Sequence, residues 1–444
     1  MIRRTTSLLA GALFAVVLGC SNAGAAEPES RWAISLPVET AKSVISKSDD
    51  AQLAWTTIGA NTVVICRGRL AESIVRRHPE VPATPFRPGE EAWLLATKDP
   101  ALRGKVFPGV RTLLRRQGYH VVLANETARM GISRWLSDFT RIDPLPADTV
   151  VLTPPSRPGR SRPSAEDPIG AFVDRIDREA FAADLKALAD LQTRSTYSAG
   201  GAKALAYVER SLTAMGLQVR RQAFGSAGAP SANIEAVQPG FDPANAGEVI
   251  ILGHLDSTSP KASTLAPGAD DNGSGAAGVL ALARLMQGRK GRASVRYVLV
   301  MGEEQGLLGS KAYVAALPPA ELANLRAVIN MDMIGFDAKA PLSMVLETAA
   351  FNREMAERMA ELAAAHTTLS TQISTNPWGS DHVPFLKKQV PTVLTIESEY
   401  DDNPTYHQVT DTFEKVNLDL AWQILRLNAA MLAEAASVER LARE

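Results

Sequence analysis

The sequence predicts an α/β fold, in which a central sheet is covered by helices on both faces. Two observations carry this prediction. Short apolar runs alternate with longer segments whose apolar residues recur at helical spacing. The apolar runs are also nearly continuous, as is typical of strands buried on both faces. The expected strands are residues 249–252, 295–301, 327–331 and 392–396, and the expected helices are residues 275–286, 307–317, 352–365 and 418–435.

Two further helices precede this pattern. The segment 172–191 carries apolar residues at helical spacing, and the segment 202–215 is followed by Gly216, a common helix terminator. Before them, residues 153–168 contain five prolines and no apolar run, which indicates a linker. We therefore expect a large C-terminal domain over residues 169–444.

The remaining residues predict a smaller domain. A chain of 444 residues, 45% hydrophobic and 21% charged, is long enough for two or three domains. Residues 31–152 read as an N-terminal α/β domain, with strands at 62–66 and 119–123 and a helix at 110–116. This domain contains no chemical motif, and its role is unknown from the sequence.

The charge and cysteine content exclude several classes of protein. Lys and Arg number 47, Asp and Glu number 48, and the net charge is −1. A general nucleic-acid binder usually carries a basic excess, so we expect no nucleic-acid partner. The two cysteines, Cys20 and Cys66, are too few for a disulfide scaffold or a Cys-rich zinc finger.

The start of the chain predicts export. Two arginines precede an uncharged apolar run at residues 8–18, which is too short for an ordinary membrane span and fits a signal peptide over residues 1–26. Two cleavage sites compete. Residues 17–20 resemble a bacterial lipobox, which would leave a lipidated Cys20 as a membrane tether, whereas residues 23–25 fit an ordinary small-residue site. We expect a periplasmic protein, an outer-membrane lipoprotein or a secreted protein.

Charged residues recur where the expected strands end. His254 and Asp256 follow the first of these strands, and their side chains point to the same side because side chains alternate along a strand. Such an aspartate can accept one imidazole N–H while the other ring nitrogen holds a metal. The other candidates are Asp270 and Asp271 in a glycine-rich turn, Glu303 and Glu304, Asp332, and His382 in the segment Ser380-Asp381-His382.

These residue types indicate a metal site. Functional groups in open α/β sheets gather at the carboxyl ends of the strands, so we expect the candidates at one edge. Carboxylate and imidazole groups without thiolate are typical of a catalytic site with open positions. Five ligands are too many for one catalytic zinc and suit two metal ions that share a carboxylate.

Five segments carry a resemblance to a known family. GHLDS, PGADDNGSG, GEEQGLLGS, NMDMIG and SDHVPF resemble the zinc-dependent exopeptidases of peptidase clan MH, and the secreted bacterial leucyl aminopeptidases in particular. The likeness runs from about residue 169 to the C-terminus and includes LQTRSTYSAGG at residues 191–201. It implies a mixed central sheet flanked by helices, zinc as cofactor and peptides as substrates.

Carried over residue by residue, the resemblance implies two zinc ions per chain. His254 and Asp332 would bind one ion, and Glu304 and His382 the other. Asp271 would bridge the two ions and be followed by the family's strained peptide bond.

The resemblance also implies roles beside the ligands. Asp256 would orient the first histidine ligand, and Glu303 would be the general base that takes a proton from the attacking water. His407 matches a family segment near the cleft and is a candidate for a place beside the substrate or behind a ligand. Met333 and Trp378 flank the ligands and are candidates for lining an apolar pocket.

The expected function is an exported dizinc aminopeptidase that removes N-terminal, apolar residues from peptides. Its spare carboxylates suit a protonated amine, and residues 397–402 add to the acidic excess. Three alternatives stay open. A carboxypeptidase of the same clan would need Arg or Lys to hold a terminal carboxylate. A glutaminyl cyclase would use one zinc, and the N-terminal domain could be a separate binding module.

Overall fold

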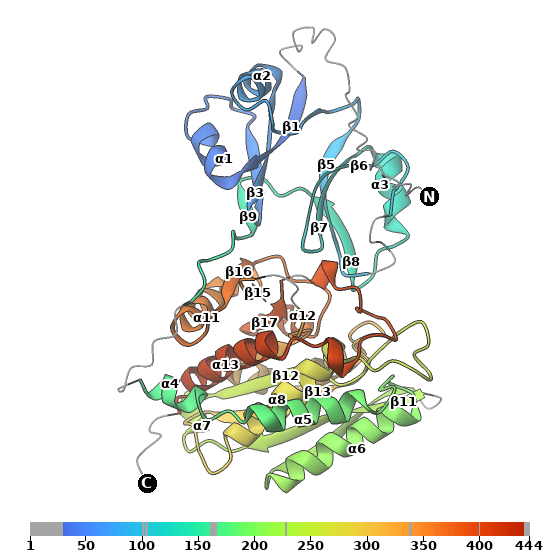
Figure 1. The fold of residues 1–444 in the computed structure, drawn as a ribbon, viewed down its shortest axis with the longest axis vertical. Coiled ribbons are helices and arrows are strands. Elements are labelled where there is room, and N and C mark those ends of the chain that lie inside the picture. Colours follow the sequence, from blue (N-terminus) through green and yellow to red (C-terminus); the bar gives the residue numbers. More distant parts are fainter. Residues whose placement is uncertain are drawn as a thin grey trace, which may run out of the picture.

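The chain folds around one large mixed sheet and one small sheet. The computed structural model describes residues 30–99, 102, 105–159, 167–226, 229–336, 340–398 and 400–438. The large sheet has 13 strands and the small one has four. Figure 1 shows the N-terminal part, residues 31–152, at one end of the long axis and the helix-covered C-terminal part at the other.

The large sheet contains strands from both parts of the chain. In sheet order its strands are β10 (Gln218–Ser226), β11 (Ala229–Gln238), β13 (Ser294–Val300), β12 (Glu248–His254), β14 (Leu325–Met331), β17 (Thr392–Glu397), β15 (Ser343–Glu347), β16 (Ser370–Ser374), β9 (Thr149–Leu152), β2 (Ala54–Ile58), β3 (Asn61–Arg67), β1 (Arg31–Pro37) and β4 (Ala83–Pro85). The small sheet has the order β6 (Arg111–Arg116), β7 (Tyr119–Ala124), β5 (Glu91–Thr97) and β8 (Thr140–Pro144).

The centre of the large sheet is parallel and its flanks are mixed. Strands β13, β12, β14 and β17 run parallel, whereas β11 and β15 pair antiparallel with β13 and β17. The carboxyl ends of the four central strands therefore meet at one edge. Within the sheet, the two parts join where β16 and β9 pair through Ser374 and Leu152.

Helices cover both faces of the C-terminal part, because consecutive strand residues face opposite ways. Ile251 belongs to a core that contains side chains of α5, α6, α8, α11 and α13, whereas Ile250 belongs to a second core with side chains of α9 and α12. The predicted fold class, a mixed sheet flanked by helices with a smaller N-terminal α/β unit, is confirmed. The helices are α1 (Val38–Ile45), α2 (Gly68–Arg77), α3 (Glu126–Ser133), α4 (Pro168–Val173), α5 (Arg178–Ala189), α6 (Ala199–Ala214), α7 (Pro243–Ala246), α8 (Gly275–Leu285), α9 (Leu308–Ala316), α10 (Pro319–Asn324), α11 (Arg353–His366), α12 (His382–Leu386) and α13 (Leu418–Ala435).

The helix expected at residues 110–116 is wrong. Residues 111–116 form β6, which pairs antiparallel with β7. Gln117 and Gly118 both have positive φ, 45° and 74°, and join the two strands as a two-residue hairpin turn. The hairpin turn at these two residues explains why the preceding segment is a strand, which the apolar spacing of that segment does not indicate.

The segment expected as a linker is tied to the C-terminal part over its described residues. The backbone N–H groups of Thr153, Ser156 and Gly159 donate to carbonyl oxygens of residues 373, 371 and 369. Residues 153–159 therefore run along β16, with most of their side chains exposed. Residues 160–166 lie outside the described residues.

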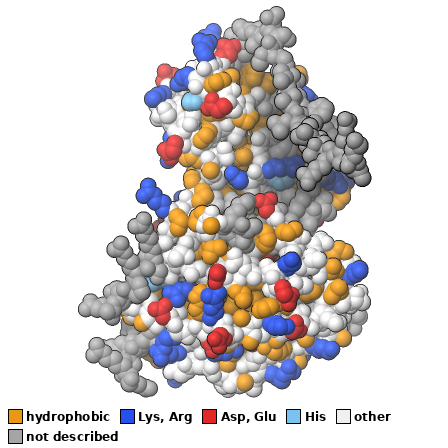
Figure 2. Space-filling view, in the orientation of Figure 1, with side chains coloured by type: hydrophobic (Ala, Val, Ile, Leu, Met, Phe, Trp, Pro, Cys, Tyr) orange, Lys and Arg blue, Asp and Glu red, His pale blue; other side chains and the backbone are white. Residues whose placement is uncertain are grey.

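The surface carries charges of both signs. On the face seen in Figure 2, Lys and Arg side chains lie interspersed with Asp and Glu side chains. Among the residues that the structure describes, no helix is long and apolar enough to span a membrane. The expected signal peptide and Cys20 lie outside those residues.

Candidate metal centre

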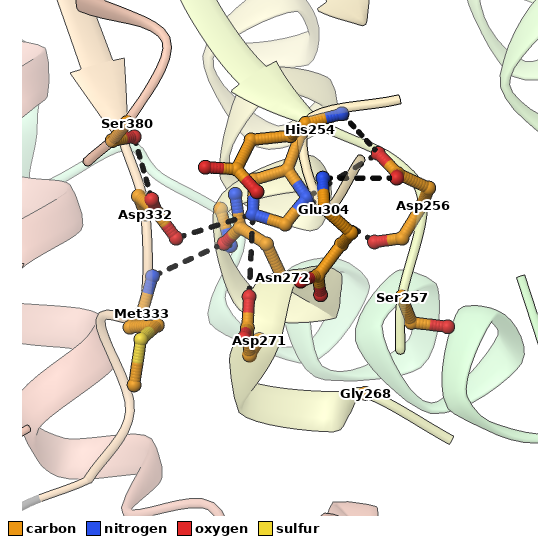
Figure 3. A network of polar contacts seen from close by, with 12 residues as sticks. His254, Asp256, Ser257, Gly268, Asp271, Asn272, Glu304, Asp332, Met333 and Ser380 are labelled. Carbon is orange, nitrogen blue, oxygen red and sulfur yellow. Dashed lines mark hydrogen bonds and ion pairs between the residues drawn. The ribbon is translucent and has the colours of Figure 1, made fainter. Parts of the chain in front are cut away.

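The candidate ligands lie at the carboxyl edge of the parallel strands. His254 is the last residue of β12, and Asp332 directly follows β14. Figure 3 shows the His254 ring between Asp332 and Asp271, and Asp271 comes from the turn before α8. His254 Nε2 lies 3.2 Å from Asp271 Oδ1 and 3.2 Å from Asp332 Oδ1. Sequence analysis placed these three residues together, and the fold brings them together.

A second group lies on the other side of Asp271. His407 Nε2 is 3.1 Å from Asp271 Oδ2 and 2.9 Å from Glu304 Oε2. One oxygen of the Asp271 carboxylate therefore faces His254, and the other faces His407. Two sets of three side chains have ligand atoms within 4.8 Å of one another: His254, Glu303 and Asp332, and Asp271, Glu304 and His407.

The turn that carries Asp271 is fixed from behind. The Asp411 carboxylate accepts the backbone N–H groups of Asp270 and Asp271, at 2.9 and 3.0 Å. Asn272 Nδ2 donates to the Met331 carbonyl at 2.8 Å, which ties the turn to the end of β14. The Asp271–Asn272 peptide bond is cis, at the position where the resemblance implies an unusual peptide.

Asp256 lies behind the first group. Its backbone oxygen is 3.2 Å from His254 Nδ1, and its carboxylate Oδ1 is 3.6 Å away. The same carboxylate accepts the backbone N–H groups of Glu303 and Glu304, at 3.3 and 3.4 Å, and the Thr196 hydroxyl at 2.9 Å. Asp256 therefore holds the His254 ring and both glutamates in one arrangement.

Asp332 is held by a residue of the loop between β16 and α12. Ser380 Oγ donates to Asp332 Oδ2 at 2.6 Å, and Asn330 Nδ2 donates to Ser380 Oγ at 3.0 Å. Figure 3 shows Ser380 next to Asp332 on the side away from Asp271. One Asp332 oxygen is thus occupied by the serine, and the other faces His254.

His382 is not part of either group, which corrects the ligand set expected from the sequence. It begins α12 and is fully buried, with Nε2 lying 3.1 Å from Glu347 Oε1. Glu347 ends β15, so its carboxylate faces the N-terminal part. His407 takes the expected place of His382, because residues 403–411 return from the end of β17 to the turn of Asp271.

The two residues expected to line a pocket differ in their surroundings. Met333 is buried next to Asp332 and has a positive φ of 53°. The Trp378 ring packs edge-on against Tyr119, with 5.9 Å between ring centroids, and the Lys98 ammonium lies 4.9 Å from its centroid. The burial of Trp378 is thus explained by contacts with the N-terminal part.

The pKa values reflect a site crowded with carboxylates. Burial raises the pKa of Glu304 to about 7, and Asp271 adds to this rise. Burial also raises the pKa of Glu303 well above its ordinary value, and the charge of Asp332 adds to it. Burial lowers the pKa of His407, but Glu304 and Asp271 outweigh that effect and raise the pKa to about 10. Such an arrangement is stabilised by cations.

Two supporting residues, Asp411 and Arg194, were not among the candidates predicted from the sequence. Asp411 lies four residues after His407 in a segment that the resemblance already covered, so its spacing was a usable signal. Arg194 lies in the segment LQTRSTYSAGG and is fully buried. Its guanidinium donates to the carbonyls of Leu255 and Gly268, at 2.8 and 2.7 Å, and so ties the strand end of His254 to the turn of Asp271.

Comparisons with known proteins match this site region. Residues 233–432 match the model of Peptidase family M28. Leupeptin-inactivating enzyme 1 of Streptomyces exfoliatus is 36% identical over 197 residues, which cover 44% of this chain and 42% of that protein. Aminopeptidase YwaD of Bacillus subtilis (strain 168) is 28% identical over 195 residues, which cover 43% and 42%. The chain thus matches about two fifths of the length of these two relatives.

A solved structure shares the fold. The zinc aminopeptidase BSAP from Bacillus subtilis superposes with a TM-score of 0.52 at 17% identity, over 61% of this chain and 97% of that one. The sequence match and the shared fold confirm the resemblance to the clan MH exopeptidases. Residues 233–432, less than half of the chain, are thus similar to peptidase family M28.

Proposed function

We propose that this protein is an exported aminopeptidase that holds two zinc ions and removes N-terminal, apolar residues from peptides. The observation that carries the proposal is the Asp271 carboxylate, which faces His254 with one oxygen and His407 with the other. A carboxylate shared in this way is what two neighbouring metal ions require.

The donor set fits zinc. It consists of imidazole and carboxylate groups, which zinc accepts in catalytic sites. Glu304 Oε1 is buried and has no hydrogen-bond partner among the described residues, as expected of an oxygen reserved for a ligand. The proposed ligands of one ion are His254 and Asp332, those of the other are Glu304 and His407, and Asp271 is shared. When bound, zinc supplies a Lewis acid that polarises the scissile carbonyl and lowers the pKa of water.

Glu303 is the proposed general base. Its carboxylate belongs to the group of His254 and Asp332, and its backbone N–H is held by Asp256. It takes the proton of the attacking water and passes it to the leaving amine. The products are the released N-terminal residue, which now has a free carboxylate, and the shortened peptide. Burial raises the pKa of Glu303 above its ordinary value, which favours taking up the proton of the water.

The cations near the site favour an aminopeptidase over a carboxypeptidase. Arg194 donates to backbone carbonyls, and Lys98 donates to the carbonyls of Trp378 and Gly379, at 3.2 and 3.3 Å. Neither is directed at the metal groups. The carboxylates of Glu303, Glu304 and the shared Asp271 instead supply the negative charge that a protonated amine needs. Two clusters around one shared aspartate likewise favour two zinc ions over the single ion of a glutaminyl cyclase.

Glu397, the last residue of β17, does not add to this amine site in the way expected. Glu397 is fully buried and accepts the backbone N–H of Phe336. Asn403 Nδ2 donates to both Glu397 and Asp270, at 3.3 and 3.0 Å. Glu397 therefore supports the turn of Asp271 from behind. Glu399 lies outside the described residues.

The test combines a zinc count with a substrate panel. We expect two zinc ions per chain by elemental analysis, and cleavage of leucyl- or phenylalanyl-type substrates with a free amine. N-acetylation of the substrate should abolish cleavage, and C-terminal amidation should have little effect. Efficient cleavage of an acetylated peptide that amidation blocks would instead establish a carboxypeptidase.

The variant Glu303→Gln tests the base. It removes the proton acceptor and leaves the proposed ligands intact, so kcat should fall by about 10²–10⁴-fold while both zinc ions stay bound. The matched control is Glu91→Gln, an exposed carboxylate of the N-terminal part paired with Arg31, which should leave kcat unchanged. Near-normal turnover by Glu303→Gln would refute the assignment.

A further inference from the structure

The N-terminal part reaches the loops that surround the candidate metal centre. Figure 1 shows the lower ends of β7 and β8 above the region of β15, β17 and α12. Arg141 at β8 donates to the Pro377 carbonyl at 2.9 Å. On the other side, Asp138 pairs with Lys311 at 2.8 Å, just after the loop of Glu303 and Glu304. The N-terminal part therefore bridges two segments that flank the site.

One of these segments is the loop of residues 375–381, between β16 and α12. It carries Ser380, which donates to Asp332 at 2.6 Å. The loop itself contains neither a proposed ligand nor the proposed base. It contacts the Asp332 carboxylate through this hydrogen bond, and its buried Asp381 adds negative charge near Glu303, so the position of the loop affects both groups.

Lys98 of the N-terminal part holds this loop by its backbone. The Lys98 ammonium donates to the carbonyls of Trp378 and Gly379, two residues and one residue before Ser380. Lys98 is 4% exposed, so these contacts are shielded from solvent. Gly379 has a φ of 61°, and a Cβ there would approach Lys98 Cδ to 3.1 Å, which shows how closely the lysine lies against the loop.

Tyr119 of the N-terminal part holds the same loop by a second route. Its hydroxyl accepts the Trp378 Nε1–H at 3.1 Å and lies 3.2 Å from Glu347 Oε2 and from the Asn376 carbonyl. Glu347 Oε1 in turn accepts the Trp378 backbone N–H at 3.1 Å. The tyrosine is 1% exposed, so both ends of this chain of contacts are buried.

We propose that Lys98 and Tyr119 are positioning residues of the peptidase site, which act on the metal ligand Asp332 through the 375–381 loop and Ser380. The N-terminal part is then a component of the active enzyme and not a module merely attached to it. This inference rests on the proposed function for the identity of the metal centre, but its central measurement requires no substrate.

The test uses the full chain and zinc itself as the probe. Tyr119→Phe removes one hydroxyl and keeps the ring, and Lys98→Met removes the ammonium and keeps most of the stem. The zinc dissociation constant is measured by competition with a chromophoric chelator. Loss of an outer partner of a metal ligand typically costs about 10–100-fold in metal affinity or activity. We expect weakening of about tenfold for the more weakly bound zinc ion in each variant.

Three further variants make the result specific. Ser380→Ala removes the direct contact and should give the same loss or a larger one. Lys98→Arg keeps a cation over the two carbonyls and should recover part of the affinity. Asp138→Ala breaks the contact with Lys311, which also joins the two parts but does not touch the 375–381 loop, and it should bind zinc like the unaltered protein. Lys311 keeps its hydrogen bond to the Gly306 carbonyl in this variant.

The outcomes separate the inference from the proposed function. Where the protein cleaves amino-acyl substrates, kcat should fall with zinc affinity while KM changes less than about twofold, since the substrate contacts are unaltered. A protein that binds zinc but cleaves no such substrate would refute the function, and the zinc affinities would still decide the inference. Unchanged zinc affinity in Tyr119→Phe and Lys98→Met, or an equal loss in Asp138→Ala, would overturn it.

Discussion

Residues 380–382 and residues 406–411 both carry a histidine and an aspartate in the C-terminal part, yet the two segments lie in different surroundings. His382 begins α12 and faces Glu347, on the side of the N-terminal part. His407 lies in a loop with a positive φ of 55° and faces Asp271 and Glu304. The difference comes from the element against which each segment packs. The spacing of a histidine along the chain does not reveal that element.

The largest expected effect follows from removing the second of these histidines. His407→Ala takes one side chain from the group of Asp271 and Glu304 and leaves their carboxylates facing each other. We expect loss of one zinc ion by elemental analysis, and a fall in kcat that exceeds the roughly 10–100-fold typical for loss of an outer partner. Full zinc content with unaltered kcat would show that His407 is not a ligand.

A smaller and different effect is expected for the first histidine. His382→Ala removes the imidazole from Glu347 Oε1, which still accepts the Trp378 backbone N–H in a buried site. Leaving a buried polar group less satisfied costs about 1–3 kcal/mol, so the free energy of unfolding should fall by that amount in urea titrations. Both zinc ions should remain bound. A zinc count of one in this variant would restore His382 to the ligand set.

The same two histidines show which parts of the site can be predicted from the sequence. The motifs around His254, Asp271 and Asp332 are each anchored to the end of a central strand, so predicting the strands also predicts where these side chains meet. The choice between His382 and His407 depends on the path of residues 398–411 after the last strand, and no hydrophobic pattern encodes that path. Loops are positioned by long-range contacts, which local spacing does not specify.

The N-terminal part was harder to predict for the same reason. Its strands 62–66 and 119–123 follow from apolar runs, but Arg111–Arg116 carries a pattern that also fits a helix. The hairpin turn at Gln117 and Gly118 settles it as a strand. Likewise, Lys98 and Tyr119 belong to no motif, because their importance comes from the loop they contact across the domain boundary.

The smallest expected effect, a change in pH dependence, also separates the two histidines. In the zinc-free protein the pKa of His407 is raised to about 10, chiefly by Glu304 and Asp271 acting against burial, whereas burial lowers the pKa of His382 below its ordinary value of about 6.5. A raised pKa in the folded state stabilises the fold fully below about pH 6.5, and this contribution is lost as the pH rises toward 10. A lowered pKa acts in the opposite direction, so the contribution of His382 is present above about pH 6.5 and is lost as the pH falls.

Urea unfolding of the EDTA-treated protein between pH 5 and 10 measures both contributions to the free energy of unfolding. The decline of stability above pH 6.5 should be shallower in His407→Ala than in the unaltered protein, and His382→Ala should keep that decline and lose part of the decline below pH 6.5. Parallel profiles for all three proteins would show that neither histidine changes its pKa on folding, and the assignment of opposite surroundings to them would then be wrong.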